Sequence, residues 1–515
     1  MFLRNTSALV LTAAALLGQN DFDLHKTTPG TLGSPLLLSY DGAPASNLCI
    51  LMVSFSSGPT AISAFDPNDT RSVQVGTELS SGWIFTVSDP GGNGGFAMAL
   101  PNNAAFNDLV LHWQVAALAT SGPLLVGQIS NDIVTQTGLA QTAVAARDTL
   151  LAARGFSVGF FDRDNNADAG DFIVAGGGAG NLTSASGLAS TELWDFRHMQ
   201  VRAGANMTTS RALHLAVPLN DDRVLIVGGV DGTGAVLASC ELYDPTTDSF
   251  AATGGMATPR VLHAACRLAD GRVMVAGGTS SLADTTSAIT GALNRVEIYD
   301  PNTGTWSNGP AIGGRRLAPA LTLLSNGQVM ASGGVEVGFL FGIPISAIST
   351  TNVQRWNPST NSWSNGPNMS QGRAGHHYNQ VTLNDGRVLL SGGTQVPSLL
   401  GAANAAPISG AELYNPATNS WTVANMPTAR ALHSANVLPN GDVVVCGGAQ
   451  GTLTVPSSIA AVERFDPTTN SWTALPALPT PRSGHAAAVM PDGTLLLFGG
   501  QGVATTTATI ETLRF

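Results

Sequence analysis

The sequence predicts an all-β protein in two parts, a small antiparallel β-sandwich and a longer region of seven repeated four-stranded units. Only 11% of the 515 residues are charged, while 59 glycines and 28 prolines indicate many short strands joined by tight turns. A Gly-Gly pair follows a short apolar run seven times, as in Leu495-Leu-Leu-Phe-Gly-Gly500. The chain is also too long for a single hydrophobic core, so we expect more than one domain.

The seven glycine pairs recur at intervals of 49 to 59 residues, and they begin at Gly176, Gly228, Gly277, Gly333, Gly392, Gly447 and Gly499. One glycine pair every ~50 residues is typical of a β-propeller in which each repeat forms a four-stranded blade. Glycine is required at this place because the chain turns sharply at the end of a strand and lies against the next blade, where a Cβ would clash.

Other residues keep a fixed register with the glycine pairs. The third strand of most units carries a glutamate, and a polar turn, an aromatic residue and an arginine follow, with a histidine three positions after the arginine; Glu297-Ile-Tyr-Asp-Pro301 precedes Trp306 and Arg316, for example. One polar residue per repeat at a fixed position favours buried structural contacts over catalysis. The fourth unit departs from the pattern, with Pro319 in place of the histidine and Gln354 in place of the glutamate.

Residues 138–515 resemble the kelch family throughout, and the stretch from Pro481 to Gly500 matches its repeat almost residue for residue. The resemblance implies a seven-bladed β-propeller. The last unit ends with its third strand, Glu511-Thr-Leu-Arg-Phe515, so its fourth strand has to come from elsewhere. We expect Gln141 to Ala145 to supply it, with Val144 in the position of the repeated tryptophan, because an unpaired strand edge is a liability.

The N-terminal region is predicted to hold an export signal and the sandwich. Residues 1–18 are interpreted as a secretory signal, because Arg4 precedes an apolar run from Ala8 to Leu17 that is too short to span a bilayer. We therefore expect a secreted, periplasmic or cell-surface protein. Residues 22–137 lack the repeat and alternate short apolar runs with turn clusters, which predicts the sandwich. Leu109-Val-Leu-His-Trp-Gln114 resembles a module of secreted bacterial proteins, and this implies an accessory or attachment role.

The charge pattern argues against a nucleic-acid partner. The net charge is −11 and Lys26 is the one lysine in the sequence, so no basic stripe could neutralise a phosphate backbone. No apolar stretch of ~20 residues follows the signal, so we predict no transmembrane segment in the mature chain. The four cysteines are interpreted as small buried apolar residues, with Cys240 and Cys266 as the one pair that could form a disulfide.

Some kelch propellers are enzymes that resemble galactose oxidase, where two tyrosines and two histidines hold copper. Of the five tyrosines, only Tyr378 stands outside both the repeat pattern and the sandwich, so this ligand set is incomplete. The sequence therefore predicts a non-catalytic scaffold that binds a protein or an extracellular glycan. The alternative is an extracellular propeller enzyme that acts on carbohydrate, which would need acidic or metal-binding residues at the mouth of the ring.

The first repeat unit has an acidic loop that is five residues longer than its counterparts. Oxygen-bearing side chains at alternate positions suit calcium, because this hard cation takes six to eight oxygen ligands from a loop that wraps it. An acidic solvated turn without an ion is the alternative interpretation. The candidate calcium ligands are Asp162, Asp164, Asn166, Asp168 and Asp171.

The connection between the glycine pair and the third strand is long in units three to five, where it has 19 or 20 residues compared with 12 in the second unit. We expect these three loops to stand together on one face, opposite the acidic loop. Two of them are apolar, and an exposed apolar patch costs solubility unless something covers it. Either a partner covers the patch, or the loops fold down onto the propeller or the sandwich. The candidate contact residues are Phe339, Leu340, Phe341, Leu399 and Leu400.

Overall fold

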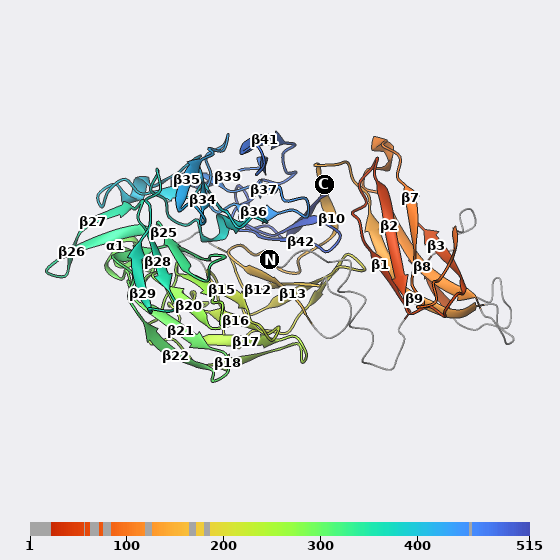
Figure 1. Ribbon diagram of the computed structural model, residues 1–515, viewed down its shortest axis with the longest axis horizontal. Coiled ribbons are helices and arrows are strands. Elements are labelled where there is room, and N and C mark those ends of the chain that lie inside the picture. Colours follow the sequence, from red (N-terminus) through yellow and green to blue (C-terminus); the bar gives the residue numbers. More distant parts are fainter. Residues whose placement is uncertain are drawn as a thin grey trace.

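The computed structural model describes residues 22–55, 57–61, 72–75, 84–118, 126–163, 171–179, 186–452 and 456–515. The predicted signal lies outside the described residues. Figure 1 shows two β-rich parts, a sandwich drawn in red to orange and a larger set of sheets drawn from yellow to blue. The predicted all-β class is confirmed, since the described residues contain one short α-helix, α1 (Thr285–Thr290), a few single-turn 3-10 helices and otherwise strands.

The N-terminal part is a sandwich of two antiparallel sheets. In sheet order its strands are β1 (Asp23–Lys26), β2 (Pro35–Asp41) and β7 (Gly94–Ala99), then β6 (Ile84–Val87), β3 (Leu48–Ser54), β8 (Val110–Leu118) and β9 (Val126–Gln136), with β4 (Ser57–Ala61) and β5 (Ser72–Val75) as a separate pair. Leu36, Leu38 and Tyr40 alternate inward along β2 and pack in one core with Trp113 from β8. Trp113 is therefore a core residue of the sandwich.

Within the described residues, the C-terminal part contains seven four-stranded antiparallel sheets, which we call blades 1 to 7. Blades 1 to 3 consist of β11 (Val158–Phe161), β12 (Phe172–Ala175), β13 (Thr191–Asp195) and β14 (Gln200–Ala203); β15 (Leu215–Pro218), β16 (Val224–Val227), β17 (Cys240–Asp244) and β18 (Ser249–Thr253); and β19 (Ala264–Arg267), β20 (Val273–Ala276), β21 (Val296–Asp300) and β22 (Thr305–Gly309).

Blades 4 to 6 consist of β24 (Ala320–Leu323), β25 (Val329–Ser332), β28 (Val353–Asn357) and β29 (Ser362–Asn365); β30 (Gln380–Thr382), β31 (Val388–Ser391), β34 (Ala411–Asn415) and β35 (Ser420–Val423); and β36 (Ser434–Val437), β37 (Val443–Cys446), β40 (Val462–Asp466) and β41 (Ser471–Leu475). Blade 7 combines β42 (Ala486–Val489), β43 (Leu495–Phe498) and β44 (Thr509–Leu513) with β10 (Ala143–Thr149). The first strands of successive blades contact one another in a closed ring, from β11 through β15, β19, β24, β30, β36 and β42 back to β11.

The two ends of the propeller pair within blade 7. The predicted closing segment, Gln141 to Ala145, is confirmed in position but not in its bounds, because the strand β10 that pairs with β44 runs from Ala143 to Thr149 and places Ala145 opposite Glu511. The predicted register was wrong by one residue: Ala143 lies opposite Leu513 and so occupies the tryptophan position that Val144 was expected to fill. The pairing shifts between Ala145 and Thr149, and the extra residue in this irregular stretch accounts for the difference.

The glycine pairs join each blade to the next. Both glycines of every pair have positive φ, and the second one donates its N–H to the carbonyl of the arginine that opens the following blade. At the closure, Gly500 donates to Arg154 at 2.8 Å. A Cβ on Gly228 would lie 2.5 Å from the Arg260 carbonyl oxygen. The predicted requirement for glycine is therefore confirmed both by conformation and by close approach.

The repeated arginines and glutamates form buried ion pairs within the blades. Six such pairs occur among the described residues, for example Arg211 with Glu241 at 2.6 Å and Arg373 with Glu412 at 2.8 Å. Five of these glutamates also accept a backbone N–H bond from a residue just before the arginine, as Glu241 does from Thr208 at 2.6 Å. The structural interpretation of these residues is confirmed, because the buried guanidinium and carboxylate groups pair with each other inside the sheets.

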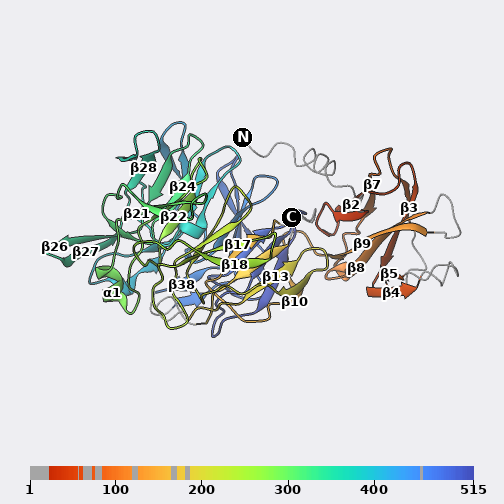
Figure 2. The ribbon, with the colours of Figure 1, turned by 90° about the horizontal axis from the view of Figure 1, so that it is seen from below.

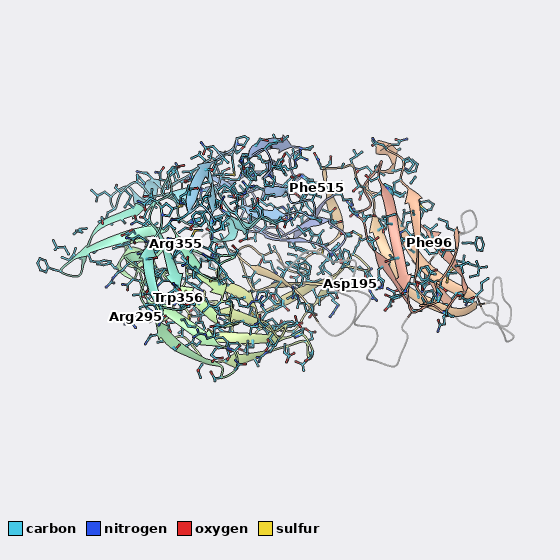
Figure 3. The ribbon with its side chains drawn as sticks, viewed as in Figure 1. Phe96, Asp195, Arg295, Arg355, Trp356 and Phe515 are labelled. Carbon is cyan, nitrogen blue, oxygen red and sulfur yellow. The ribbon has the colours of Figure 1, made fainter. Side chains whose placement is uncertain are left out.

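The sandwich packs against blades 1 and 7 through polar contacts. The Lys26 ammonium lies 3.0 Å from the Asp492 carboxylate and 4.5 Å from the centre of the Phe196 ring, and both charged side chains are almost fully buried. His198 joins the two parts, since it lies 2.7 Å from Asp195 in the propeller and 3.4 Å from Asp132 in the sandwich. Figure 3 shows Asp195 on the side of the propeller that faces the sandwich.

Candidate functional site at the loop-covered mouth of the channel

The long loops of blades 3 to 5 gather over one end of the central channel, as expected. They contain α1, the hairpin of β26 (Val335–Leu340) and β27 (Ile343–Ser349), and the segment from β32 (Thr394–Gln395) through the 3-10 helix η4 (Ala402–Asn404) to β33 (Ala406–Pro407). Leu282, Ile289, Val337, Ala347 and Val396 from these loops share one buried cluster. Figures 1 and 2 show the hairpin at the end of the molecule far from the sandwich, so the sandwich does not cover it.

The predicted contact residues divide between the inside and the outside of this cluster. Phe339 and Leu399 pack against the shared cluster, and the Arg315 guanidinium lies 4.5 Å from the centre of the Phe339 ring. Leu340, Phe341 and Leu400 are exposed instead, with Phe341 at 95% and Leu400 at 98% of their full exposure. The loops therefore cover the propeller with their bases while their tips remain in solvent.

The exposed tip of the hairpin carries further apolar side chains that sequence reasoning did not single out. Ile343, Ile345 and Ile348 on β27 are each at least half exposed, and they extend the surface formed by Leu340 and Phe341. We call these five residues the hairpin tip. Alternation explains the exposure of Ile348 between the buried Ala347 and Ser349, whereas Ile343 and Ile345 are exposed because they lie toward the turn of the hairpin, where the pairing becomes irregular.

Beneath the loops, the channel contains a cavity of about 470 Å³. Most of its walls are apolar, with Leu282 and Ile289 from the loop of blade 3, Val396 from the loop of blade 5, and Ala265 and Ala435 from inner strands. A second cavity of about 410 Å³ lies toward the other end of the channel and shares Ala435 with the first. The channel is therefore covered at one mouth and continues to the other.

A collar of seven residues surrounds the channel at the covered mouth. Each collar residue stands two positions after a repeated arginine, and all seven have positive φ and line the cavity: Phe156, Leu213, Leu262, Ala318, Gly375, Leu432 and Gly484. Backbone bonds connect neighbours in the collar, such as Phe156 N–H to the Gly484 carbonyl at 2.7 Å and Gly375 N–H to Ala318 at 2.9 Å. Positive φ is costly for a residue with a Cβ, about 1 kcal/mol or more each.

The histidines that follow the collar serve the packing between blades. Each imidazole packs on the glycine pair of the preceding blade, and His376 and His433 share hydrogen bonds with Ser332 and Ser391, both at 3.0 Å. Burial lowers the pKa of both histidines well below 6.5, so they are neutral. Pro319 fills the same space in blade 4, since its Cγ lies 2.9 Å from where a Cβ of Gly277 would be.

Blade 4 also replaces the repeated glutamate. The Gln354 side-chain oxygen accepts the Gly313 N–H at 2.8 Å, which keeps the backbone contact of the missing carboxylate. Among the described residues Arg316 has no ion pair, and Glu336 on β26 lies opposite it in the strand register. The negative charge of Glu336 opposes the effect of desolvation, which lowers the pKa of Arg316. The extra hairpin thus compensates for the glutamine.

The predicted calcium loop lies at the opposite end of the channel. Val158, at the start of β11, lines the covered mouth, whereas Asp162 follows the last residue of that strand. Two of the five candidate ligands are described: Asp162, whose N–H donates to the Asp171 carbonyl at 2.9 Å, and Asp171, whose carboxylate accepts the Phe196 N–H at 3.1 Å. Asp164, Asn166 and Asp168 lie outside the described residues. In the described part of the chain, no group of three or more histidine, cysteine or acidic side chains is arranged to hold a metal.

The four cysteines are unpaired. Cys240 and Cys266 belong to different clusters between blades, and burial raises the pKa of their thiols to about 11 and about 12. They fill space as apolar residues, as expected. No helix within the described ranges is long and apolar enough to cross a membrane.

Sequence reasoning missed the collar, because its position does not stand out in the repeat. The position two residues after each arginine varies between Phe, Leu, Ala and Gly, and the preceding position varies as much, between Gly, Ala, Val, Leu and Ser. Its left-handed backbone could not be read from the sequence, because leucine and phenylalanine rarely adopt it.

Comparisons with known proteins agree with this architecture. The kelch motif matches residues 260–311 and 430–479, which fall in blades 3 and 6. Spermatocyte protein spe-26 of Caenorhabditis elegans is 28% identical over 212 residues, which are 41% of this chain and 34% of that protein. Kelch domain-containing protein 10 of Xenopus tropicalis is 31% identical over 191 residues, 34% of this chain and 42% of that protein. The chain thus spans well under half the length of these relatives.

Among solved structures, a fungal alcohol oxidase in complex with copper superimposes with a TM-score of 0.52 over 72% of this chain and 75% of that chain. The two sequences are 18% identical, so the likeness shows the fold alone. Together with the closed ring of sheets and the repeated glycine, arginine and glutamate contacts, these matches show a β-propeller fold for the C-terminal part of the chain, with kelch motifs in blades 3 and 6.

Proposed function

We propose that this protein is a scaffold that binds another protein through the hairpin tip. Kelch repeats imply a protein-interaction scaffold. The observation that carries the proposal is the exposure of Leu340, Phe341, Ile343, Ile345 and Ile348 together on one projecting hairpin. Soluble proteins rarely leave such a patch uncovered, and each large apolar side chain gains about 1.5–3 kcal/mol when it is buried in an interface.

The chemistry of the tip favours a protein over a glycan. A glycan presents mostly hydroxyl groups, and burying them against the aliphatic Leu340, Ile343 and Ile345 would leave their hydrogen bonds unmade. The apolar core of a protein interface needs no such bonds and is enriched in aromatic side chains such as Phe341. Export from the cytoplasm stays a prediction from residues 1–18.

The double variant L340S/F341S tests the proposal. It is expected to change the free energy of unfolding by no more than about 0.5 kcal/mol, because neither side chain belongs to the buried cluster. Phe339→Ser is expected to destabilise the protein by about 2 kcal/mol, since Phe339 packs on the cluster. Urea unfolding distinguishes these two effects before binding is measured.

Binding is measured with the photo-crosslinking residue benzoylphenylalanine at position 345 in the full-length protein, expressed in its own cells. We expect one discrete crosslinked protein, which L340S/F341S removes and the control Val503→Ser retains, because Val503 is equally apolar and exposed but lies outside the hairpin. Crosslinking that L340S/F341S leaves unchanged, or that yields no discrete product, would overturn the proposal.

A further inference from the structure

The cavity in the channel is unused by the scaffold function and has the form of a small-molecule site. Its volume of about 470 Å³ falls in the range of about 300–1,000 Å³ that binding pockets commonly have. The loops of blades 3 to 5 cover it on one side, and the second cavity adjoins it on the other side, where both are lined by Gly159, Ala435 and Ala487. A ligand could therefore enter from the end of the channel opposite the hairpin.

The room in the channel comes from small residues at equivalent positions of the repeat. The fifth residue after the arginine is glycine or alanine in five blades, and all five line the cavity: Gly159, Ala216, Ala265, Ala435 and Ala487. In the collar, Ala318 and Gly375 are adjacent small residues, whereas Leu213, Leu262 and Leu432 narrow the rest of it. Adjacent small residues on one arc leave a gap on the side where the long loops form the roof.

The walls carry no charge near neutral pH. Burial lowers the pKa of His377 to about 4 and that of His485 to about 3, and it lowers the pKa of His263 and His433 well below 6.5. A charged ligand would find no counter-ion among these groups, and burying an unpaired charge is costly.

Several buried polar groups in the wall lack a hydrogen-bond partner among the described residues, including Ser157 Oγ, both ring nitrogens of His263 and the Asn436 amide nitrogen. Of these groups, Asn436 alone lines both cavities, and it lies on the inner strand of blade 6. A buried donor without a partner costs about 1–3 kcal/mol, and an acceptor on a bound molecule would recover this energy.

We propose that the cavity binds a small neutral organic molecule that is mostly apolar and carries one hydrogen-bond acceptor, such as a ketone or an alcohol. The apolar walls take its hydrocarbon part, and the Asn436 amide donates to its oxygen. The site is separate from the hairpin tip, so a protein partner and this molecule bind at different places.

Gly375 offers a substitution that fills the cavity without disturbing the fold. A Cβ at this position meets nothing within 4 Å, although its φ is +68°. Leucine already occupies the equivalent collar position at φ of 53° to 55° in three other blades, so the propeller tolerates Leu in this conformation. Gly375→Leu therefore closes the gap with a side chain that the repeat itself uses. Gly327→Leu is the matched control, because Gly327 also has positive φ, meets nothing within 4 Å and is absent from the cavity wall.

The probe is prodan, a neutral naphthalene ketone whose emission shifts to shorter wavelength in apolar surroundings. We expect saturable binding to the full-length protein, at least tenfold weaker in Gly375→Leu and unchanged in Gly327→Leu and in L340S/F341S. Ala318→Leu fills the same gap from a residue that already has a Cβ, and it gives a second test if Gly375→Leu folds poorly. Asn436→Leu should weaken the binding of prodan more than it weakens the binding of an equally large naphthalene that lacks the carbonyl.

The proposal is overturned if prodan binds equally well to wild type, Gly375→Leu and Ala318→Leu, or if the wild type gives no shifted emission. Loss of the signal in L340S/F341S with retention in Gly375→Leu would assign the probe to the hairpin tip instead and would also refute the cavity site. The anionic dye anilinonaphthalene sulfonate should bind the wild-type cavity more weakly than prodan; equal or tighter binding that Gly375→Leu abolishes would refute the neutral-ligand assignment.

Discussion

Single residues stabilise this propeller because their buried charges and polar atoms bind one another inside the sheets. Arg373, for example, donates to Glu412 at 2.8 Å and also to the carbonyls of Gly392 at 3.0 Å and Gly410 at 2.7 Å. Such a buried arginine is tolerated because each bond replaces one to water. Blade 4 shows the alternative solution, in which Gln354 keeps the backbone contact and a neighbouring strand supplies Glu336.

Glu412→Gln is expected to destabilise the protein by about 3 kcal/mol, because it leaves Arg373 buried without a negative partner and blade 5 has no equivalent of Glu336 among the described residues. Urea unfolding measures the change. Asp270→Asn is the control. The ion pair of Asp270 with Arg272 is exposed to solvent, so its loss should change the free energy of unfolding by less than about 1 kcal/mol. Equal effects of the two substitutions would show that the buried ion pair contributes no more to the free energy of unfolding than the exposed pair.

The residue types that recur in every blade could be predicted because their reasons are local or periodic. The glycine pair needs positive φ at the end of each inner strand, and the arginine and glutamate meet within one blade. The collar could not be predicted in the same way. Its leucines and phenylalanine take a backbone conformation that only the contacts between blades impose, as in the bond from Ala318 N–H to Leu262 at 2.8 Å.

At the scale of elements, the repeat does not determine how the ring closes or what covers the channel. These two features depend on β10 and on the three long loops. The need for a closing strand followed from counting strands, and residues near Val144 were the correct segment. The register differed by one residue because counting residues along the repeat cannot show the irregular pairing after Ala145. The loops of blades 3 to 5 were expected together, yet which side chains of β27 are buried depended on their distance from the base of the hairpin and on its irregular pairing, since Ile345 is exposed and Ala347 is buried.

The acidic loop between β11 and β12 carries the calcium prediction at this scale. Calcium is expected to raise the melting temperature of the wild type, because binding to the folded state alone stabilises it, and to have no such effect on Asp164→Ala. Thermal unfolding with and without millimolar calcium measures this. Magnesium is the control ion, since it needs fewer ligands at shorter distances. An equal response of both proteins to calcium would mean that the loop is a solvated turn.

At the scale of the whole molecule, the sandwich and the propeller are held together by buried polar contacts. Lys26 is the single lysine of the chain, and its buried pair with Asp492 lies at this interface. Arg197 lies 3.8 Å from Asp23, and His198 bridges Asp132 and Asp195. Charges of both signs therefore meet across the interface, and its strength should depend on pH.

His198 determines the direction of that dependence. Hydrogen bonds to Asp132 and Asp195 raise the pKa of His198 to about 10, against a smaller opposing effect of burial. Because separation of the two parts removes Asp132 and so lowers the pKa of His198, protonated His198 stabilises the interface, and this stabilisation is lost as the pH rises through about 10.

We therefore expect the sandwich to separate from the propeller more readily at about pH 10 than at about pH 7. Small-angle X-ray scattering measures the change as an increase in the radius of gyration. His198→Gln removes the titrating group and should give a smaller change over the same pH range, because only the other charges at the interface remain. An identical response of the two proteins would show that His198 does not control the contact.

The sequence by itself determined the all-β class, the kelch-type repeat, the structural role of its glycines, arginines, glutamates and histidines, and the segment that closes the ring. These features follow from local conformation and from a period that repeats along the chain. Only the tertiary structure decided that Phe339 packs inward while Phe341 is exposed, that a collar and small inner-strand residues leave a cavity in the channel, and that Lys26 is buried against Asp492. Each of these depends on segments far apart in the chain that meet when the blades close, and such contacts leave no periodic trace in the sequence.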